Sequence, residues 1–179
     1  MTKSKKTVYL IDGSAMFYRA YFAFIRNPLI NSKGEDTSAT FGFVNSLLKL
    51  IDNEKPDYIA VAFDTKHPTF RHKMYDEYKS TRAKMPDELV EQLPRIKQSV
   101  EALNLCSFEM KGYEADDIIG TLAKDAEKEG HDVYLVTGDK DFFQLVNDNI
   151  KIYNPKSSAG QPDVMAGKKS RLSSAFIPN

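Results

Sequence analysis

The feature that most constrains the fold of this chain is a set of short apolar runs, rich in β-branched residues, that alternate with segments of helical length. Such runs predict strands at 7–12, 58–63, 105–110, 133–137 and 150–153. The segments between them predict helices at 14–24, 37–53, 86–103, 118–126 and 141–146. Because strands joined through helical crossovers pair in parallel, the predicted fold class is α/β. We expect three layers, with a central, mostly parallel sheet and helices on both faces.

Three local expectations accompany this assignment. Ser14 is a natural N-cap for the helix at 14–24. Cys106 is the single cysteine, which excludes an intramolecular disulfide, and its apolar surroundings predict a small buried residue rather than a nucleophile. In the helix at 37–53, spacings of three and four residues predict one buried face made of Phe41, Val44, Leu47, Leu48 and Ile51.

The length of 179 residues is that of one ordinary domain, and we place that domain at residues 1–155. From Asn154 onward the sequence is rich in Pro, Gly and Ser and has no sustained period, so residues 156–179 are predicted to form a flexible tail. The basic N-terminus is followed by an apolar run that Asp12 interrupts at once, without a cleavage pattern. We therefore expect a cytoplasmic protein that does not enter a membrane.

Acidic residues recur where a predicted strand ends or a predicted helix begins: Asp12, Asp64, Asp139, Glu114, Asp116 and Asp117. Taken singly, each could be a turn residue or a favourable charge at a helix N-terminus. Taken together, they would meet at the carboxyl edge of a parallel sheet, repel one another and raise one another's pKa unless a cation neutralised them. Carboxylates without His or Cys select Mg²⁺ or Mn²⁺, and the three histidines lack zinc-site spacing. The predicted chemistry is phosphodiester cleavage by a metal-activated water.

A local basic and aromatic segment lies between residues 66 and 84, although the formal net charge of the whole chain is zero. Its side chains have two interpretations. Basic groups could contact phosphates while aromatic faces stack on unpaired bases, or the segment could be a solvated amphipathic stretch whose aromatics pack on the core. The segment contains Phe70, Arg71, Lys73, Tyr75, Tyr78, Lys79 and Arg82.

Seven motifs carry a resemblance to a known family, and they recur in order at residues 8–14, 18–21, 62–64, 70–71, 78–82, 112–120 and 137–141. Over residues 6–155 the chain closely resembles the 5′ nuclease family, which includes flap endonucleases and has a PIN-like fold. The form it resembles is the N-terminal 5′-3′ exonuclease domain of bacterial DNA polymerase I. The resemblance implies a metal-dependent enzyme that hydrolyses phosphodiester bonds of DNA near a 5′ end or flap, in DNA replication and repair. It also implies Mg²⁺ or Mn²⁺ as cofactor, with two ions in the full family site.

The resemblance further implies a role for individual residues. Five acids would hold the first ion and its water shell: Asp12, Asp64, Glu114, Asp116 and Asp117. Asp139 and Asp141 would contribute to the metal centre, and Lys79 and Arg82 would join the first five acids as catalytic residues. The implied DNA contacts are Arg19, Arg71, Tyr78, Lys79 and Arg82, and Lys73 is added through its position in the basic segment.

The C-terminal residues depart from the family pattern. The family continues with a Gly-Asp-x-x-Asp-Asn motif and a helix-hairpin-helix element, and neither is found in residues 156–179. We therefore expect a C-terminally truncated domain, and a catalytically impaired DNA-binding remnant is the main alternative. A ribonuclease of the small toxin class is a second alternative, although that class lacks the Tyr78-Lys79-Arg82 segment. A dehalogenase-type phosphatase is excluded because Asp12 is followed by Gly13-Ser14 rather than by a second acid.

Overall fold

The computed structural model describes residues 4–81, 83–155 and 163–166. The strands in these residues are β1 (Thr7–Asp12), β2 (Tyr58–Ala62), β3 (Cys106–Phe108), β4 (Asp132–Val136), β5 (Ile150–Asn154) and β6 (Asp163–Met165). They form one sheet in the order β3-β2-β1-β4-β5-β6. All neighbouring pairs are parallel except β5 and β6, which are antiparallel. The mostly parallel sheet confirms the predicted fold class.

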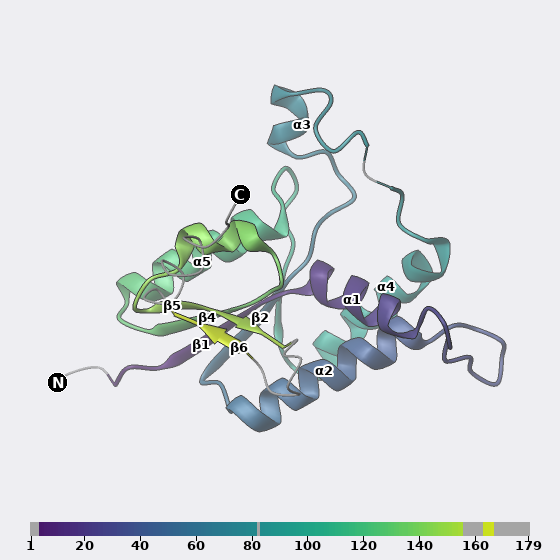
Figure 1. The fold of residues 1–179 in the computed structure, drawn as a ribbon, viewed down its shortest axis with the longest axis horizontal. Coiled ribbons are helices and arrows are strands. Elements are labelled where there is room, and N and C mark those ends of the chain that lie inside the picture. The colour runs from purple at the N-terminus through teal and green to yellow at the C-terminus, as the bar shows by residue number, and fades with distance from the viewer. Residues whose placement is uncertain (1–3, 82, 156–162, 167–179) are drawn as a thin grey trace, which may run out of the picture.

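Helices cover both faces of this sheet, so the molecule has three layers (Figure 1). The helical elements are α1 (Gly13–Phe24), α2 (Ser38–Glu54), α3 (Phe70–Met74), α4 (Asp87–Ala102), α5 (Ala115–Lys128) and the 3-10 helix η1 (Lys140–Leu145). Alternate residues of a strand point to opposite faces. On β1, Tyr9 and Ile11 pack with α1, α2 and α4, whereas Val8 and Leu10 pack with α5 and η1. Each face of the sheet therefore has its own apolar core.

The position of β1 between β2 and β4 determines where a site can form. From β1 the chain first builds outward to β2 and β3, and then returns to add β4 and β5 on the other side. In an open α/β sheet, such a reversal leaves a crevice outside the carboxyl ends of the strands. The segment that carries α3 extends away from the helical layers (Figure 1). The fold thus provides a strand edge and a separate projecting segment.

The structure corrects several local expectations. The side chain of Asp12, not Ser14, caps α1 by accepting a hydrogen bond from the backbone N of Ala15 (2.8 Å). Cys106 is exposed, because β3 is a short strand at the edge of the sheet and all three of its residues are exposed. In α2 the predicted buried face is confirmed at Leu47, and Val44 and Ile51 pack against the core as partly buried residues, but Phe41 and Leu48 are exposed. The buried positions of that helix are Ser38, Ala39, Gly42, Phe43, Leu47 and Leu50.

Two further differences concern the C-terminal half. The helix predicted at 141–146 is the 3-10 helix η1. Within the range predicted to be a tail, Asp163–Met165 forms β6 and pairs with β5, with Tyr153 opposite Val164. The rest of 156–179, apart from residue 166, lies outside the described residues. Among the helices that the structure describes, none combines the length and the apolar character that crossing a bilayer requires.

Candidate metal centre and nucleic-acid interface

Asp12 is the innermost of the acidic residues, because it ends the central strand β1 and is only 6% exposed. Its Oδ1 accepts the hydrogen bond from the backbone N of Ala15, and its Oδ2 accepts one from the hydroxyl of Thr137 (3.2 Å). Burial raises the pKa of Asp12, and the charges of Asp64 and Asp139 raise it further. The carboxylate is therefore fixed in place and influenced by two other acids.

Asp64 connects the ends of two helices at the same edge of the sheet. It follows β2 by two residues, and its backbone N donates a hydrogen bond to the hydroxyl of Ser14 (3.1 Å) in the first turn of α1. Its Oδ1 accepts a hydrogen bond from the backbone N of Ala115, the first residue of α5 (2.8 Å). Helix N-termini carry partial positive charge, which favours a carboxylate at this position.

Glu114 is the N-cap of α5 and is 7% exposed. It forms a capping box with Asp117, in which each side chain accepts a hydrogen bond from the backbone N of the other residue. Its Oε1 accepts a hydrogen bond from Lys79 Nζ (2.9 Å), and its Oε2 accepts one from the hydroxyl of Tyr78 (3.1 Å). These contacts compensate the cost of burying the carboxylate.

Asp116 lies in the first turn of α5, and its pKa is strongly raised. Burial raises its pKa to about 7, and the remaining causes are the negative charges of Asp12, Asp139, Asp64 and Glu114, in that order. These residues come from the ends of β1 and β2, the loop after β4 and the start of α5. The predicted convergence of acids from distant parts of the sequence is therefore present in the structure.

Asp139 and Asp141 lie at the start of η1. Asp139 is the N-cap, since its Oδ1 accepts a hydrogen bond from the backbone N of Asp141 (2.9 Å). Both residues are exposed. Asp141 lines a cavity of about 560 Å³ together with Glu114, Asp116 and Asp117. The loop after β4 thus adds two carboxylates to the same side of the molecule.

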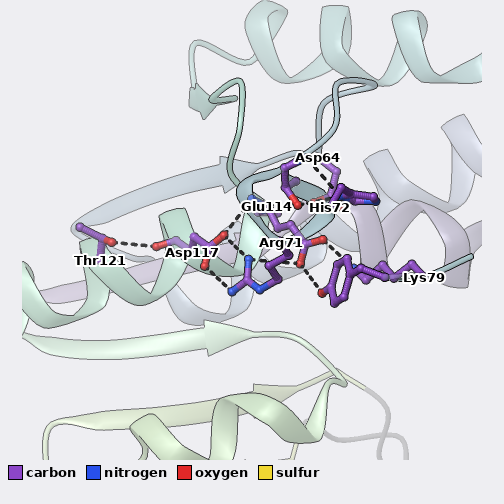
Figure 2. A network of polar contacts seen from close by, with 10 residues as sticks. Asp64, Arg71, His72, Lys79, Glu114, Asp117 and Thr121 are labelled. Atoms are coloured by element: carbon purple, nitrogen blue, oxygen red, sulfur yellow. Dashed lines mark hydrogen bonds and ion pairs between the residues drawn. The ribbon is translucent and has the colours of Figure 1, made fainter. Parts of the chain in front are cut away.

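The basic segment lies against the acids, as Figure 2 shows for Arg71 and Lys79. The two terminal nitrogens of Arg71 donate to the two carboxylate oxygens of Asp117, both at 2.7 Å. This pairing lowers the pKa of Asp117 and raises that of Arg71. Lys73 is exposed on α3, and Arg82 lies outside the described residues. Acids and bases that the sequence assigned to different ligands are therefore bound to one another here.

Lys79 has an unusual backbone conformation, with φ at 57°. This left-handed region is uncommon for residues other than glycine and is concentrated at functional sites. The conformation occurs at the residue whose ammonium group reaches Glu114, and Tyr78 immediately before it reaches the same carboxylate. The turn thus directs two successive side chains to one acid.

Arg19 lies on α1 and lines a separate cavity of about 530 Å³ with Thr137 and Gly138. Burial lowers the pKa of Arg19, and the charge of Asp12 acts in the opposite direction. The guanidinium is therefore near the innermost acid, on the side of the loop that follows β4.

Two residues that hold the acids were missed by sequence reasoning. Thr137 is 3% exposed; its hydroxyl donates to Asp12 and accepts a hydrogen bond from the backbone N of Asp139 (3.1 Å). Ser14 binds the backbone of Asp64. The available signal was a hydroxyl residue beside each acid at a strand end, in Thr137-Gly138-Asp139 and Asp12-Gly13-Ser14.

The donor set fits a hard divalent cation. Within residues 4–81, 83–155 and 163–166, no three His, Cys, Asp or Glu side chains are already grouped as ligands of one ion. The acids around Asp116 nevertheless offer only carboxylate oxygen, and burial together with their negative charge raises its pKa to about 7. Oxygen donors with excess negative charge are the chemistry that Mg²⁺ and Mn²⁺ require.

The chain matches known proteins over most of its length. Residues 7–171 match the family model described as "5′-3′ exonuclease, N-terminal resolvase-like domain". DNA polymerase I of Chloroflexus aurantiacus is 47% identical over 155 residues, covering 87% of this chain and 16% of the polymerase. DNA polymerase I of Bacillus subtilis is 48% identical over 153 residues, covering 85% and 17%. The chain therefore spans about a sixth of the length of these relatives.

Solved structures share the fold. One, of the bacteriophage T5 D15 flap endonuclease in a pseudo-enzyme-product complex with DNA and metal ions, has a TM-score of 0.67 at 18% identity, covering 94% of this chain and 60% of that chain. Another, of T5 5′-exonuclease with bound zinc, has a TM-score of 0.66 at 21% identity, covering 90% and 58%. The resemblance found in the sequence motifs is thus confirmed by the family model and by the fold. This chain belongs to the family of 5′-3′ exonuclease N-terminal, resolvase-like domains.

Proposed function

We propose that the chain is a Mg²⁺- or Mn²⁺-dependent 5′ nuclease that hydrolyses phosphodiester bonds of DNA near a free or flapped 5′ end. The observation that carries the proposal is the placement of the acids: Asp12 ends β1, Asp64 binds the backbone N of the first residue of α5, and Glu114 and Asp116 lie at the start of the same helix. A cluster of mutually destabilising carboxylates at the carboxyl edge of a parallel sheet is costly unless a cation shares it. The DNA polymerase I relatives support DNA as the substrate, and the T5 flap endonuclease supports a 5′ end.

Two ions are proposed for the site, as in the full family pattern. Asp12, Asp64, Glu114 and Asp116 would hold the first ion and its water shell, and Asp139 and Asp141 would contribute to the metal centre. A divalent ion bound there supplies positive charge to the attacking and leaving oxygens of the phosphodiester and lowers the pKa of a water molecule. The role of the protein is to fix the carboxylates before substrate arrives, which it does through the α1 N-terminus, Thr137 and the α5 capping box.

Basic and aromatic residues beside the acids would bind the DNA. Lys79 is bound to Glu114 in this structure, so we propose that its ammonium group exchanges this carboxylate for a phosphate oxygen when DNA and metal bind. Tyr78, with its hydroxyl on the same carboxylate, would offer its ring to an unpaired base. Arg19, Lys73 and Arg82 would bind further phosphates. We also propose that the enzyme acts in the cytoplasm.

A panel of end-labelled substrates tests this function. The purified chain would be incubated with Mg²⁺ and a duplex carrying a 5′ flap, the same duplex with a 3′ flap, and an RNA copy of the flapped strand. We expect cleavage near the junction of the 5′ flap only, and none in EDTA. Equal cleavage of both flap polarities contradicts a 5′ nuclease, and preference for the RNA strand favours the ribonuclease alternative. Metal-dependent DNA binding with no cleavage of any substrate favours the catalytically impaired remnant.

A further inference from the structure

Arg71 and Asp117 form a bidentate ion pair beside the candidate metal centre. Their two nitrogen–oxygen distances are both 2.7 Å, which is the geometry of a guanidinium fork on a carboxylate. The Arg71 side chain is 32% exposed and that of Asp117 is 22% exposed. Figure 2 shows the pair between α3 and the first turn of α5. Because the two residues are 46 positions apart, this contact fixes a projecting segment to the helix that bears the acids.

Asp117 also takes part in the capping box at the start of α5. One of the oxygens bound to Arg71, Oδ2, also accepts a hydrogen bond from the backbone N of Glu114 (3.0 Å). Through the capping box, the Glu114 side chain in turn binds the backbone N of Asp117. Both oxygens of Asp117 are therefore engaged by groups that fix the position of Glu114.

Arg71 is itself held in place from α3. Its guanidinium lies 4.5 Å from the centroid of the Phe70 ring, and Nη1 lies 3.6 Å from Oε2 of Glu114. The backbone N of Phe70 donates to the carbonyl of Gly112 (2.9 Å), two residues before Glu114. The α3 segment thus contacts the loop before α5 through its backbone as well as through the ion pair.

We propose that Arg71 and Asp117 act together as a positioning pair that orients Glu114 in the metal centre, and that neither binds the metal or a phosphate directly. The role of Glu114 as a metal ligand, on which this inference depends, rests on the proposed function. Recruiting Asp117 to a metal would break the bidentate contact and leave the partly buried guanidinium of Arg71 with only its longer contact to Glu114, which is costly. Outer residues that orient metal ligands typically change metal affinity about 10- to 100-fold when they are replaced.

Mn²⁺ titration by calorimetry of Arg71→Lys, Asp117→Asn and the double variant tests the pair. Arg71→Lys keeps the charge and removes the fork, so electrostatics alone predicts unchanged Mn²⁺ affinity, whereas a positioning role predicts a loss of about 10-fold or more. We expect Asp117→Asn to lose Mn²⁺ affinity by a similar factor. We expect the double variant to bind Mn²⁺ no more weakly than the single variant that has the lower affinity. Arg95→Lys is the matched control, because Arg95 on α4 forms an exposed ion pair with Glu35, and we expect this variant to keep wild-type Mn²⁺ affinity.

The outcomes separate this inference from the proposed function. If the wild-type chain binds Mn²⁺ but Arg71→Lys does so equally well while Asp117→Asn does not, Asp117 is an independent ligand and the positioning pair is overturned. Additive losses in the double variant overturn it as well. If the wild-type chain binds no Mn²⁺, the proposed function fails, and the inferred role of Glu114 fails with it. Limited trypsin digestion gives a readout without metal: we expect faster cleavage of residues 71–84 in both single variants than in Arg95→Lys.

Discussion

Replacing Asp116 with asparagine is expected to stabilise the metal-free protein, because the native fold confines its charge among other acids. Burial and neighbouring carboxylates raise the pKa of Asp116 from its ordinary 3.8 to about 7. At about 1.36 kcal/mol per pH unit, this difference corresponds to roughly 4 kcal/mol of unfolding free energy. Asp116 is only partly buried, so solvent screening reduces the value to about 2 kcal/mol.

The pH range in which this effect develops follows from the direction of the shift. A carboxyl whose pKa is higher in the folded state keeps its proton there after the unfolded chain has lost it. The free energy of unfolding therefore falls as pH rises from about 4 to about 7, and the full cost is present above that range. Asp116→Asn has no such proton to lose, so its stability does not carry this contribution.

Urea unfolding in EDTA, followed by circular dichroism, measures the effect in both proteins at pH 4.5 and pH 8. Subtracting the two curves removes the groups whose titration does not depend on the charge of Asp116. We expect Asp116→Asn to gain most of the roughly 2 kcal/mol relative to wild type between these pH values. Adding Mg²⁺ at pH 8 should stabilise the wild-type protein more than the variant. Equal pH dependence in the two proteins would refute the reasoning, since Asp116 would then titrate as it does in the unfolded chain.

Three further predictions concern DNA binding, site support and packing. Lys79→Ala with Arg82→Ala should weaken DNA binding and reduce the slope of log affinity against log salt by roughly 1 to 2, and an unchanged slope in fluorescence anisotropy would remove both residues from the DNA path. Thr137→Val should lower the free energy of unfolding by about 1–2 kcal/mol because it removes the hydrogen bond to Asp12, whereas Thr137→Ser should stay close to wild type in urea unfolding. Gly13→Ala should cost about 1–3 kcal/mol in the same assay, because a Cβ there would lie 2.6 Å from the Phe63 ring, and combination with Phe63→Leu should recover part of the loss.

The parts of the fold that local periodicity controls could be predicted from the sequence. The buried strands β1 and β4 are continuous apolar runs, so the acid that closely follows each run could be placed at the sheet edge from the sequence pattern alone. The edge strand β3 was harder, because an edge strand need not be buried, and Cys106 was wrongly placed in the core. In α2 apolar residues lie on two faces of the helix, and tertiary packing buries the face that contains Phe43 and Leu47.

The candidate site was predictable as a set of acids, but their partners were not. Strand-end positions indicated that Asp12 and Asp64 would lie at one edge of the sheet, because parallel strands end there, and the predicted helix start indicated that Asp116 would lie at the same edge. The pairing of Arg71 with Asp117 depends on how the α3 segment folds back onto α5, and residue spacing carries no information about a contact across 46 positions. For the same reason, Lys79 could be predicted as a basic residue beside the site but not as the partner of Glu114.

Cleavage of a 5′-labelled flap duplex by the purified chain, in Mg²⁺ and with Asp116→Asn beside it, tests the proposed metal-dependent nuclease activity most directly. We predict metal-dependent release of the flap by the wild-type protein and loss of cleavage in both EDTA and the variant, with DNA binding in EDTA nearly unchanged. Cleavage that persists in Asp116→Asn would contradict this prediction, because the acid on which the other carboxylates act would then have no part in the reaction.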